Sequence, residues 1–323
     1  MRAAVFTTYG GPDVVTVQDH PQPVVSDGEV LVRVRAVVVT AADVAARSGS
    51  PFIARLYFGL LRPKLSVLGS DFAGEIEAVG VSVTSFRVGD RVQGSTGAAL
   101  GAHVEYLAVA SDSTLTAIPE NLSFTEAIAA FEGAMTALPF LRDAARLQSG
   151  QRILINGASG SVGSAAVQIA HSMGAHVTAV CSGTNADLVR SIGADDVVDY
   201  TKDDFTAARD SYDVIFDAVG KSSFARARRA LTSNGIYLTT VPTPAIMVLR
   251  ATTAKSKGKR AGIAFAGLLS VAEAKRNIAE ISVLASSGAI VPVIDRAFPV
   301  SEIAEAHRLV DTGHKRGNVV VTF

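Results

Sequence analysis

The chain has 323 residues, 48% of them hydrophobic, and its 30 lysines and arginines balance 30 aspartates and glutamates. This length allows two domains with buried cores, and the zero net charge excludes a global attraction to nucleic acid or an anionic membrane. The single cysteine, Cys181, excludes an internal disulfide framework, fits a reducing compartment and leads us to expect a cytoplasmic protein. No secretory signal core is visible, and no apolar run approaches the roughly 18 residues of a membrane span.

Residues 1–110 have the pattern of a β-rich domain with many turns. Alternating or valine-rich runs are separated by Pro21, Pro23 and the Asp27-Gly28 pair, which are typical of turns. Short strands at this spacing predict a partly closed antiparallel barrel. The predicted strands are residues 1–6, 14–17, 29–39, 71–79 and 104–109, with a further strand after the turn at residues 87–90.

The pattern changes near residue 120. Ser123 and Glu126 form a capping-box pattern, and the alanine-rich residues 127–138 continue as a helix. From there helical patterns alternate with short apolar runs, which is typical of a doubly wound parallel sheet. The predicted strands are residues 152–155, 176–180, 197–200, 213–216 and 235–238.

The last 55 residues contain two more predicted helices and a strand. Residues 271–286 form the first helix, and the second is predicted to be capped by Ser301 and ended by Gly313. Residues 319–322 are a closing strand that we expect to return to the first domain.

Residues 152–182 predict a strand, a glycine turn, a helix and a second strand. Gly157 permits a tight turn, Gly160 lets a pyrophosphate approach the backbone, and Gly163 lets the helix pack closely on the sheet. The N–H groups at the start of the helix would meet the phosphate charge. The usual tight G-x-G pair is absent, and the alternative interpretation is a glycine-rich turn that only packs. We predict a βαβ dinucleotide-binding site.

The end of the second strand indicates which nucleotide binds. An NAD site usually carries Asp or Glu about 20 residues after the glycines, where it accepts from the ribose 2′-OH. Here the run Cys181–Asn185 contains no acid, and the first one is Asp187. Hydroxyl and amide donors accept a 2′-phosphate that a carboxylate would repel, so we predict NADPH over NADH.

From end to end the chain resembles the medium-chain dehydrogenase/reductase superfamily, in its zinc-independent quinone oxidoreductase branch. The motifs that carry the resemblance are Thr40–Asp43 with Arg47–Gly49, Gly69–Glu75, Val88–Val92, Gly133–Ala137, the Gly157–Gly163 turn and Asp217–Gly220. The resemblance implies a GroES-like barrel built from both ends of the chain, an inserted Rossmann domain, and an active site in the cleft. We therefore expect residues 1–121 and 268–323 to form the GroES-like catalytic domain and residues 122–267 the dinucleotide-binding domain.

The zinc-dependent branch of this superfamily binds catalytic zinc through a Cys and through the His of a Gly-His-Glu motif. Here Thr40 and Ser70 stand at those places, and one cysteine cannot supply a structural four-cysteine site. We interpret the six scattered histidines as surface or packing residues and expect no metal. Without zinc to stabilise an alkoxide, we predict hydride transfer from NADPH to a quinone or an α,β-unsaturated carbonyl.

The resemblance also implies which residues contact the cofactor. Thr136 would lie near the nicotinamide, and Asn318 would approach the cofactor from the closing strand. The remaining contacts would be Ser159, Gly160, Ser161 and Val162 at the pyrophosphate, Ser182, Asn185 and Tyr200 at the 2′-phosphate, and Ala218, Val219, Val241 and Phe265 at the ribose and nicotinamide. For each of these except the glycine turn, ordinary packing is the alternative interpretation.

Two residues are candidates for the chemistry itself. Thr40 stands where related quinone reductases carry Asn, and its hydroxyl could donate to a carbonyl oxygen. Tyr57 lies in the apolar segment 53–58, and its phenol could donate a proton, with lid or core packing as the alternative. We interpret Asp43 as a structural residue that holds its turn.

The predicted partners are a small carbonyl or quinone substrate and a second copy of the chain. The family implies a homodimer through a sheet edge at Tyr237–Val241. A basic cluster at Lys255, Lys257, Lys259 and Arg260 is interpreted as a solvated loop, or as a guide for anionic ligands. No aromatics interleave with these charges, so we expect no nucleic acid. The alternative functions are an enoyl-thioester or aldehyde reductase, and a cofactor-binding scaffold without turnover.

Overall fold

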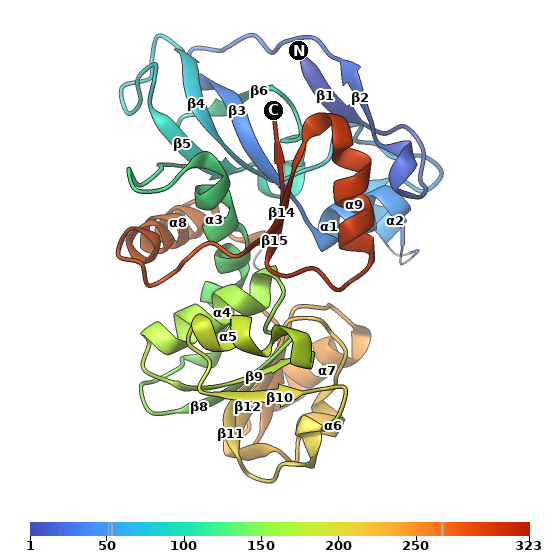
Figure 1. The fold of residues 1–323 in the computed structure, drawn as a ribbon, viewed down its shortest axis with the longest axis vertical. Coiled ribbons are helices and arrows are strands. Elements are labelled where there is room, and N and C mark those ends of the chain that lie inside the picture. Colours follow the sequence, from blue (N-terminus) through green and yellow to red (C-terminus); the bar gives the residue numbers. More distant parts are fainter. Residues whose placement is uncertain (51, 53, 266–267) are drawn as a thin grey trace. The chain divides into compact units, whose positions relative to one another are not determined.

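The computed structural model describes residues 1–50, 52, 54–265 and 268–323, and the chain forms two compact units (Figure 1). The barrel unit comprises Met1–Glu132, Gly267–Ser286 and Pro292–Phe323, and the Rossmann unit comprises Gly133–Ala266 and Ser287–Val291. The division falls inside one helix, α3 (Phe124–Leu138). The end of the second domain that we predicted at residue 267 lies outside the described residues, and the domain boundaries stay a prediction.

The barrel unit is built around one long strand, β3 (Glu29–Val39). This strand pairs antiparallel with β4, β6 and β15, and the main sheet runs in the order β14-β15-β3-β4-β5-β7. A separate hairpin is formed by β1 (Arg2–Val5) and β2 (Thr16–Asp19). The other strands are β4 (Asp71–Val79), β5 (Arg91–Ser95), β6 (Tyr106–Ala110), β7 (Thr114–Ala117), β14 (Ile294–Pro299) and β15 (Asn318–Thr322). This arrangement confirms the predicted partly closed barrel.

Both ends of the chain meet in this barrel. Val319 of β15 pairs with Val39 of β3, so the closing strand returns to the first domain as predicted. Alternate residues of β3, β4 and β15 face one continuous core that includes Val32, Phe72 and Val321. The helices of this unit are α1 (Ala41–Ser48), α2 (Ala54–Phe58), the first part of α3, α8 (Val271–Ser286) and α9 (Ile303–Asp311).

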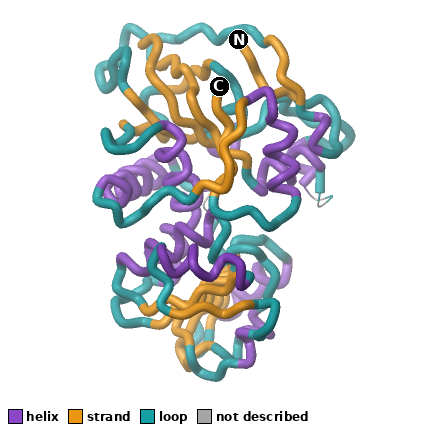
Figure 2. Tube along the Cα trace, in the orientation of Figure 1, coloured by secondary structure: helices purple, strands orange, loops and turns teal. Residues whose placement is uncertain are grey.

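The Rossmann unit contains a six-stranded sheet in the order β10-β9-β8-β11-β12-β13. Every pair of neighbouring strands in it is parallel, and Figure 2 shows helices flanking these strands. The strands are β8 (Arg152–Asn156), β9 (His176–Cys181), β10 (Asp196–Asp199), β11 (Tyr212–Asp217), β12 (Leu231–Thr239) and β13 (Arg260–Gly262). The helices are α4 (Ser161–Ser172), α5 (Ala186–Ser191), α6 (Phe224–Ala227) and α7 (Pro244–Thr253), after a π-helical turn, η3 (Pro139–Ala145). The doubly wound parallel sheet is therefore confirmed.

Two local predictions are wrong. Ser301 does not cap the last helix, because it lies inside a 3-10 turn, η7 (Val300–Glu302), and Glu302 is the N-cap of α9. The proposed dimer edge at Tyr237–Val241 is not an edge either, because β13 pairs along β12 and Tyr237 faces Ala261 in that pairing. The three-residue β13 has no strong sequence signal, so the outermost strand was missed.

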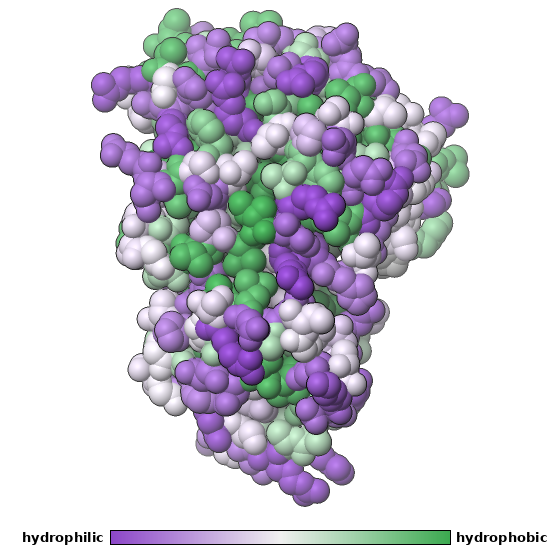
Figure 3. Space-filling view, viewed as in Figure 1, coloured by the Kyte–Doolittle hydropathy of each residue, from purple (hydrophilic) through white to green (hydrophobic). Residues whose placement is uncertain are grey.

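Two features of the surface bear on partners. No helix in the described part of the chain is long and apolar enough to cross a membrane. On the face drawn in Figure 3, hydrophilic side chains predominate, and hydrophobic ones gather over the central part of the barrel unit.

Candidate functional site

The glycine turn joins the end of β8 to the start of α4. Gly157 has a φ of 82°, in the left-handed region that favours glycine. A Cβ at Gly163 would overlap the carbonyl oxygen of Gly157, so glycine is needed for α4 to begin this close to the strand. A Cβ at Gly160, in contrast, would have the Gly157 oxygen as its nearest neighbour, at 3.6 Å. The turn thus leaves open space over Gly160, at the N-terminal end of a 12-residue helix.

This open space lies at the switch point of the sheet. β8 has β9 on one side and β11 on the other, and Asn156, the last residue of β8, faces both Val180 and Asp217. Ligands of open α/β sheets bind outside the carboxyl ends of the strands at such a point. Because phosphate groups are stabilised at helix N-termini, the turn fits the pyrophosphate of a dinucleotide.

One buried carboxylate, Asp217, organises the loop beside the turn. Its Oδ1 accepts from Asn156 Nδ2 and Gly220 N, both at 2.9 Å, and its Oδ2 accepts from Ser222 N at 2.9 Å and from the Tyr237 hydroxyl at 2.8 Å. Burial and this carboxylate raise the pKa of Tyr237. From the sequence, Asp217 was recognised only as part of a family motif, and its role as the central acceptor was missed.

The loop held by Asp217 carries two of the predicted cofactor residues, Ala218 and Val219, and a third, Val241, lies beside it. A Cβ at Gly157 would overlap the side chain of Val219, and one at Gly220 would overlap the side chain of Val241. These two valines remain 44% and 39% exposed, and Thr240 Oγ1 donates to the Ala218 oxygen at 3.1 Å. The structure therefore brings Ala218, Val219 and Val241 together next to the glycine turn.

Two other predicted nicotinamide residues lie elsewhere in the Rossmann unit. Phe265 follows β13, and the guanidinium of Arg250 lies 5.5 Å from the centroid of its ring. Thr136 lies in the last turn of α3 and is partly buried. Their contacts with a nicotinamide stay a prediction.

The predicted 2′-phosphate residues form a small polar cluster beyond the turn. Asn185 Nδ2 donates to Ser159 Oγ at 3.1 Å and to Ser182 Oγ at 3.2 Å. The other polar atom of this amide is buried and has no hydrogen-bond partner among the described residues. A bound ribose or phosphate group would satisfy it, because the amide can present either its oxygen or its nitrogen. Tyr200 flanks the cluster and is 52% exposed.

A carboxylate that we did not predict lies beside this cluster. Asp199 ends β10, opposite Cys181 in the pairing with β9, and accepts a hydrogen bond from the backbone of Gly183. Hydrogen bonds from the Thr201 hydroxyl and amide hold the pKa of Asp199 below its usual range, and Lys202 Nζ lies 3.7 Å away. The acid was missed because we searched only the residues that follow β9, whereas the neighbouring strand supplies it.

Substituting Asp199 with Asn is expected to favour NADPH over NADH. The change removes one negative charge next to the predicted 2′-phosphate residues, and exposed charge interactions of this kind change affinity by roughly two- to five-fold. The measurement is the ratio of the dissociation constants for NADPH and NADH, obtained by calorimetry. Asp187→Asn, a fully exposed acid on α5, is the control, and an equal ratio in both variants would show that Asp199 does not face the 2′ position.

In the barrel unit, the two ends of a capping box tie the predicted substrate residue Thr40 to Asp43. Thr40 Oγ1 donates to Asp43 Oδ2 at 2.7 Å and accepts from Asp43 N at 3.2 Å, and Asp43 Oδ1 accepts from Gly69 N at 2.8 Å. The structural interpretation of Asp43 agrees with these bonds. The hydroxyl proton of Thr40 is already used, so this residue can offer a ligand only its remaining lone pair.

The carboxyl group of Asp71 lies at the start of β4, directly after the turn that Asp43 holds. Ser70 Oγ donates to Asp71 Oδ2 at 2.8 Å, and Ser95 on β5 bonds the same carboxyl group. Burial raises the pKa of Asp71 to about 7, and the nearby carboxylates of Glu132 and Asp43 act in the same direction. No sequence signal distinguished this acid from a strand residue.

Tyr57 belongs to an exposed apolar segment rather than to the core. Its hydroxyl donates to Ala98 O at 3.3 Å, and its ring meets the Phe58 ring edge-on. Its side chain is 58% exposed, and over half of each neighbouring side chain at Phe52, Leu56, Leu60 and Leu61 is also exposed. The first residue of the predicted segment, Ile53, lies outside the described residues.

Asn318 lies in the barrel unit and is fully engaged there. Its side chain is 3% exposed, and its Nδ2 donates to Ala129 O at 2.8 Å and to Val293 O at 3.2 Å. These bonds tie β15 to α3, and a cofactor contact of this residue stays a prediction.

The basic cluster follows α7. Lys255 and Lys257 are exposed, whereas Lys259 Nζ pairs with Asp210 Oδ1 at 3.1 Å and donates to Arg228 O at 3.0 Å. Lys259 therefore joins two loops of the Rossmann unit, whereas Lys255 and Lys257 lie in a solvated loop, as predicted.

No group of three or more His, Cys, Asp or Glu side chains in the described residues is arranged to hold a metal ion. His103 and His307 are both buried, with ring centroids 6.4 Å apart, and His103 Nε2 lies 3.0 Å from Val38 O. Burial lowers the pKa of His307 to about 3, so this ring is neutral at physiological pH. The independence from zinc stays a prediction.

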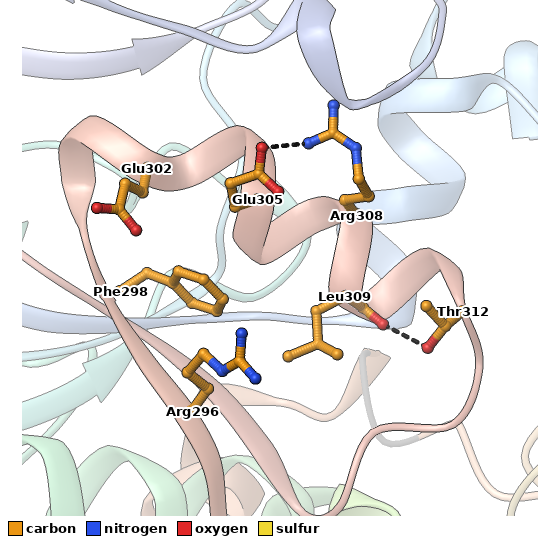
Figure 4. A pocket seen from close by; sticks show the side chains of 7 residues that line it. All are labelled: Arg296, Phe298, Glu302, Glu305, Arg308, Leu309 and Thr312. Atoms are coloured by element: carbon orange, nitrogen blue, oxygen red, sulfur yellow. Dashed lines mark hydrogen bonds and ion pairs between the residues drawn. The ribbon is translucent and has the colours of Figure 1, made fainter.

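A surface pocket of about 370 Å³ lies on the barrel unit between β14 and α9 (Figure 4). Its residues are Arg296, Phe298, Glu302, Glu305, Arg308, Leu309 and Thr312. Arg308 is paired with Glu305 and with Asp13, and Arg296 lies over the ring of Phe298. None of the predicted site residues lines this pocket.

Comparison with known proteins agrees with this architecture. The family model described as the alcohol dehydrogenase GroES-like domain matches residues 26–120, and the model described as zinc-binding dehydrogenase matches residues 192–321. The mouse mitochondrial NAD(P)H oxidoreductase RTN4IP1 is 32% identical, over 99% of this chain and 89% of its own length. The chloroplastic NADPH-dependent alkenal/one oxidoreductase of Arabidopsis thaliana is 30% identical, over 99% of this chain and 79% of its own length. The quinone oxidoreductase structure from Coxiella burnetii is 28% identical, with a TM-score of 0.87 over 100% of this chain and 99% of that one.

A barrel joined to a parallel sheet with a glycine turn at its switch point defines a dinucleotide-dependent oxidoreductase fold. The chain belongs to the medium-chain dehydrogenase/reductase superfamily, in its quinone oxidoreductase-like branch.

Proposed function

We propose that this protein is a zinc-independent reductase that transfers a hydride from NADPH to a quinone or an α,β-unsaturated carbonyl. The observation that carries the proposal is the open space over Gly160, at the N-terminus of α4 and beside the loop that Asp217 holds. NADPH, when bound, supplies the hydride. Ser159, Gly160, Ser161 and Val162 would hold its pyrophosphate.

The remaining cofactor contacts follow from the groups gathered around the turn. Ala218, Val219 and Val241 would form the wall against the ribose and nicotinamide, with Thr136 and Phe265 completing the nicotinamide site. Ser182, Asn185 and Tyr200 would bind the 2′-phosphate through hydroxyl and amide groups. Two relatives have NAD(P)H or NADPH in their names, and this supports the assignment of the cofactor.

The acceptor is inferred from the exposed apolar side chains of Phe52, Leu56, Tyr57, Leu60 and Leu61 and from the relatives. These side chains suit a flat, weakly polar ligand such as a quinone or an enone, because contact with it removes apolar surface from water. One relative is named as an alkenal/one oxidoreductase, and one similar structure is a quinone oxidoreductase. We also propose that the acceptor is a small molecule, that the protein forms a homodimer and that it is located in the cytoplasm.

Steady-state oxidation of NADPH and of NADH, followed at 340 nm, tests this function. The acceptors would be 1,4-benzoquinone, a trans-2-alkenal, a saturated aldehyde and an enoyl thioester. We expect turnover with the first two, faster with NADPH, by protein that metal analysis shows to be free of zinc. Turnover only with the aldehyde or thioester would identify a different reductase. Tight NADPH binding without turnover on any acceptor would identify a scaffold, and equal or faster turnover with NADH would contradict the cofactor preference.

A further inference from the structure

Reduction of an enone or a quinone requires a proton as well as a hydride, and the function proposed above does not say where the proton comes from. The oxygen that becomes negatively charged must receive it from a group that is protonated near neutral pH. Thr40 is poorly suited, because its hydroxyl donates to Asp43 Oδ2 at 2.7 Å and that carboxyl group also accepts from the backbone N–H groups of Thr40 and Gly69, so nothing there replaces the proton. The Tyr57 hydroxyl lies on the exposed segment and donates to Ala98 O at 3.3 Å.

The structure holds a hydroxyl–carboxyl pair next to Thr40. Ser70 Oγ and Asp71 Oδ2 are 2.8 Å apart, and both side chains are partly buried. Ser70 is linked to both candidate substrate residues. Asp43 joins its turn to Thr40 through Gly69 N, and Thr96, which donates to Ser70 O, is two residues before Ala98, whose oxygen accepts from the Tyr57 hydroxyl. A hydroxyl at this place can reach the oxygen of an acceptor bound beside Thr40 and Tyr57.

One carboxylate fixes this pair relative to Thr40. Asp43 accepts from Thr40 N and Oγ1 through Oδ2 and from Gly69 N through Oδ1, all within 2.8 Å. The Gly69 turn cannot shift easily, because Gly69 has a φ of 82° and a Cβ there would overlap the buried ring of His103. Thr96 N also donates to Ser70 O at 2.8 Å. Thr40 and the Ser70-Asp71 pair are therefore presented together by one rigid turn.

We propose that Ser70 donates the proton to the acceptor oxygen and that Asp71 restores it. Hydride addition forms a C–H bond at the electrophilic carbon of the acceptor, and the displaced π electrons move to the oxygen. When Asp71 is protonated, its carboxyl group donates to Ser70 Oγ and leaves the Ser70 hydroxyl proton free for the acceptor. The oxygen takes that proton, Ser70 takes the carboxyl proton of Asp71, and water then reprotonates the Asp71 carboxylate. The sum is one hydride and one proton added to the acceptor. This inference rests on the proposed function.

The charges around Asp71 support this role. The pKa of Asp71 is raised to about 7, chiefly by burial, and the carboxylates of Glu132 on α3 and Asp43 on α1 contribute in the same direction. The hydrogen bonds from Ser95 and Ser70 act in the opposite direction. Lys315, whose own pKa is lowered by burial, is attracted to Glu132 and thereby moderates the negative charge near Asp71. A carboxyl group with this pKa can both give up and regain a proton at neutral pH.

Asp71→Asn is the main test, because its neutral amide resembles the protonated carboxyl group in shape and leaves the packing of β4 intact. With the trans-2-alkenal and NADPH, we expect kcat to fall on the order of 100-fold and the dissociation constant of NADPH to stay unchanged. The wild-type kcat should decline above pH 7 as Asp71 loses its proton, and this decline should be absent in Asp71→Asn. Ser70→Ala should show a similar loss of kcat, and Asp71→Glu should restore part of the activity.

Glu77→Gln makes the same carboxyl-to-amide change at an exposed position of the same strand and is the control. A carboxyl carbon titration of wild type by NMR, without acceptor, should show one aspartate titrating near pH 7 that is missing in Asp71→Asn. If wild type turns over the alkenal and Asp71→Asn keeps both its kcat and the decline above pH 7, the proton role is wrong and the reductase function stands. If wild type reduces no acceptor, the function and this inference fail together.

Discussion

Replacing Gly160 with alanine is expected to weaken NADPH binding on the order of 10- to 100-fold while the protein folds normally. The added methyl group has no protein atom nearer than 3.6 Å, and Gly160 has an ordinary extended backbone with a φ of −81°, so folding is unaffected. The methyl group would instead occupy the space in which a pyrophosphate approaches the backbone. Calorimetric titration with NADPH measures the affinity, and thermal unfolding of the unliganded variant checks the fold.

Two other glycines make this experiment specific. Gly11→Ala adds a methyl group in open space in the barrel unit and should change neither affinity nor stability. Gly163→Ala should instead lower the stability of the Rossmann unit, because its methyl group would overlap the Gly157 oxygen. A Gly160→Ala variant that binds NADPH as tightly as wild type would show that the turn only packs.

Replacing Asp217 with alanine is expected to reduce the free energy of unfolding on the order of 3–5 kcal/mol. The carboxylate is fully buried and accepts from Asn156, Gly220, Ser222 and the Tyr237 hydroxyl, all of which would lose their acceptor. The freed loop at residues 218–222 would also weaken NADPH binding. Denaturant unfolding, followed by a probe in the Rossmann unit, measures the loss.

Asp217→Asn and Asp187→Ala are the comparison variants for this prediction. The amide of Asp217→Asn keeps one acceptor oxygen and should lose less stability than alanine. Asp187 is fully exposed on α5 and, among the described residues, its one ion pair is with Arg190, so its removal should cost at most a few tenths of a kcal/mol. A loss below about 1 kcal/mol in Asp217→Ala would mean that water replaces the carboxylate and that the loop does not depend on it.

Periodic patterns predicted the elements of this fold well. The bounds of β3, β4 and α8 agree with the predicted ranges, because alternating apolar residues and a clear capping pattern define them. The parallel order of the second sheet followed from the alternation of strands and helices. The errors lie at short or weakly patterned elements, such as β13, with only three residues, and the start of α9, where a 3-10 turn replaces the expected cap.

Site residues that strand pairing brings together were harder to predict than residues that lie close together in the sequence. Ser159, Ser182 and Asn185 are joined by hydrogen bonds, and the family resemblance implied all three. Asp199 reaches Gly183 only because β10 lies beside β9, a neighbour relation that the run after β9 does not contain. The raised pKa of Asp71 likewise depends on its burial in the folded barrel unit, and also on Glu132 and Asp43, which are far away in the sequence.

A crystal structure of the protein with NADPH would show whether the glycine turn binds the cofactor. We expect the diphosphate to lie over Gly160, within hydrogen-bond distance of backbone N–H groups at residues 160–162, and the nicotinamide ring to lie against Val219 and Val241. A nucleotide bound elsewhere, or a turn that remains empty at a saturating NADPH concentration, would contradict this expectation.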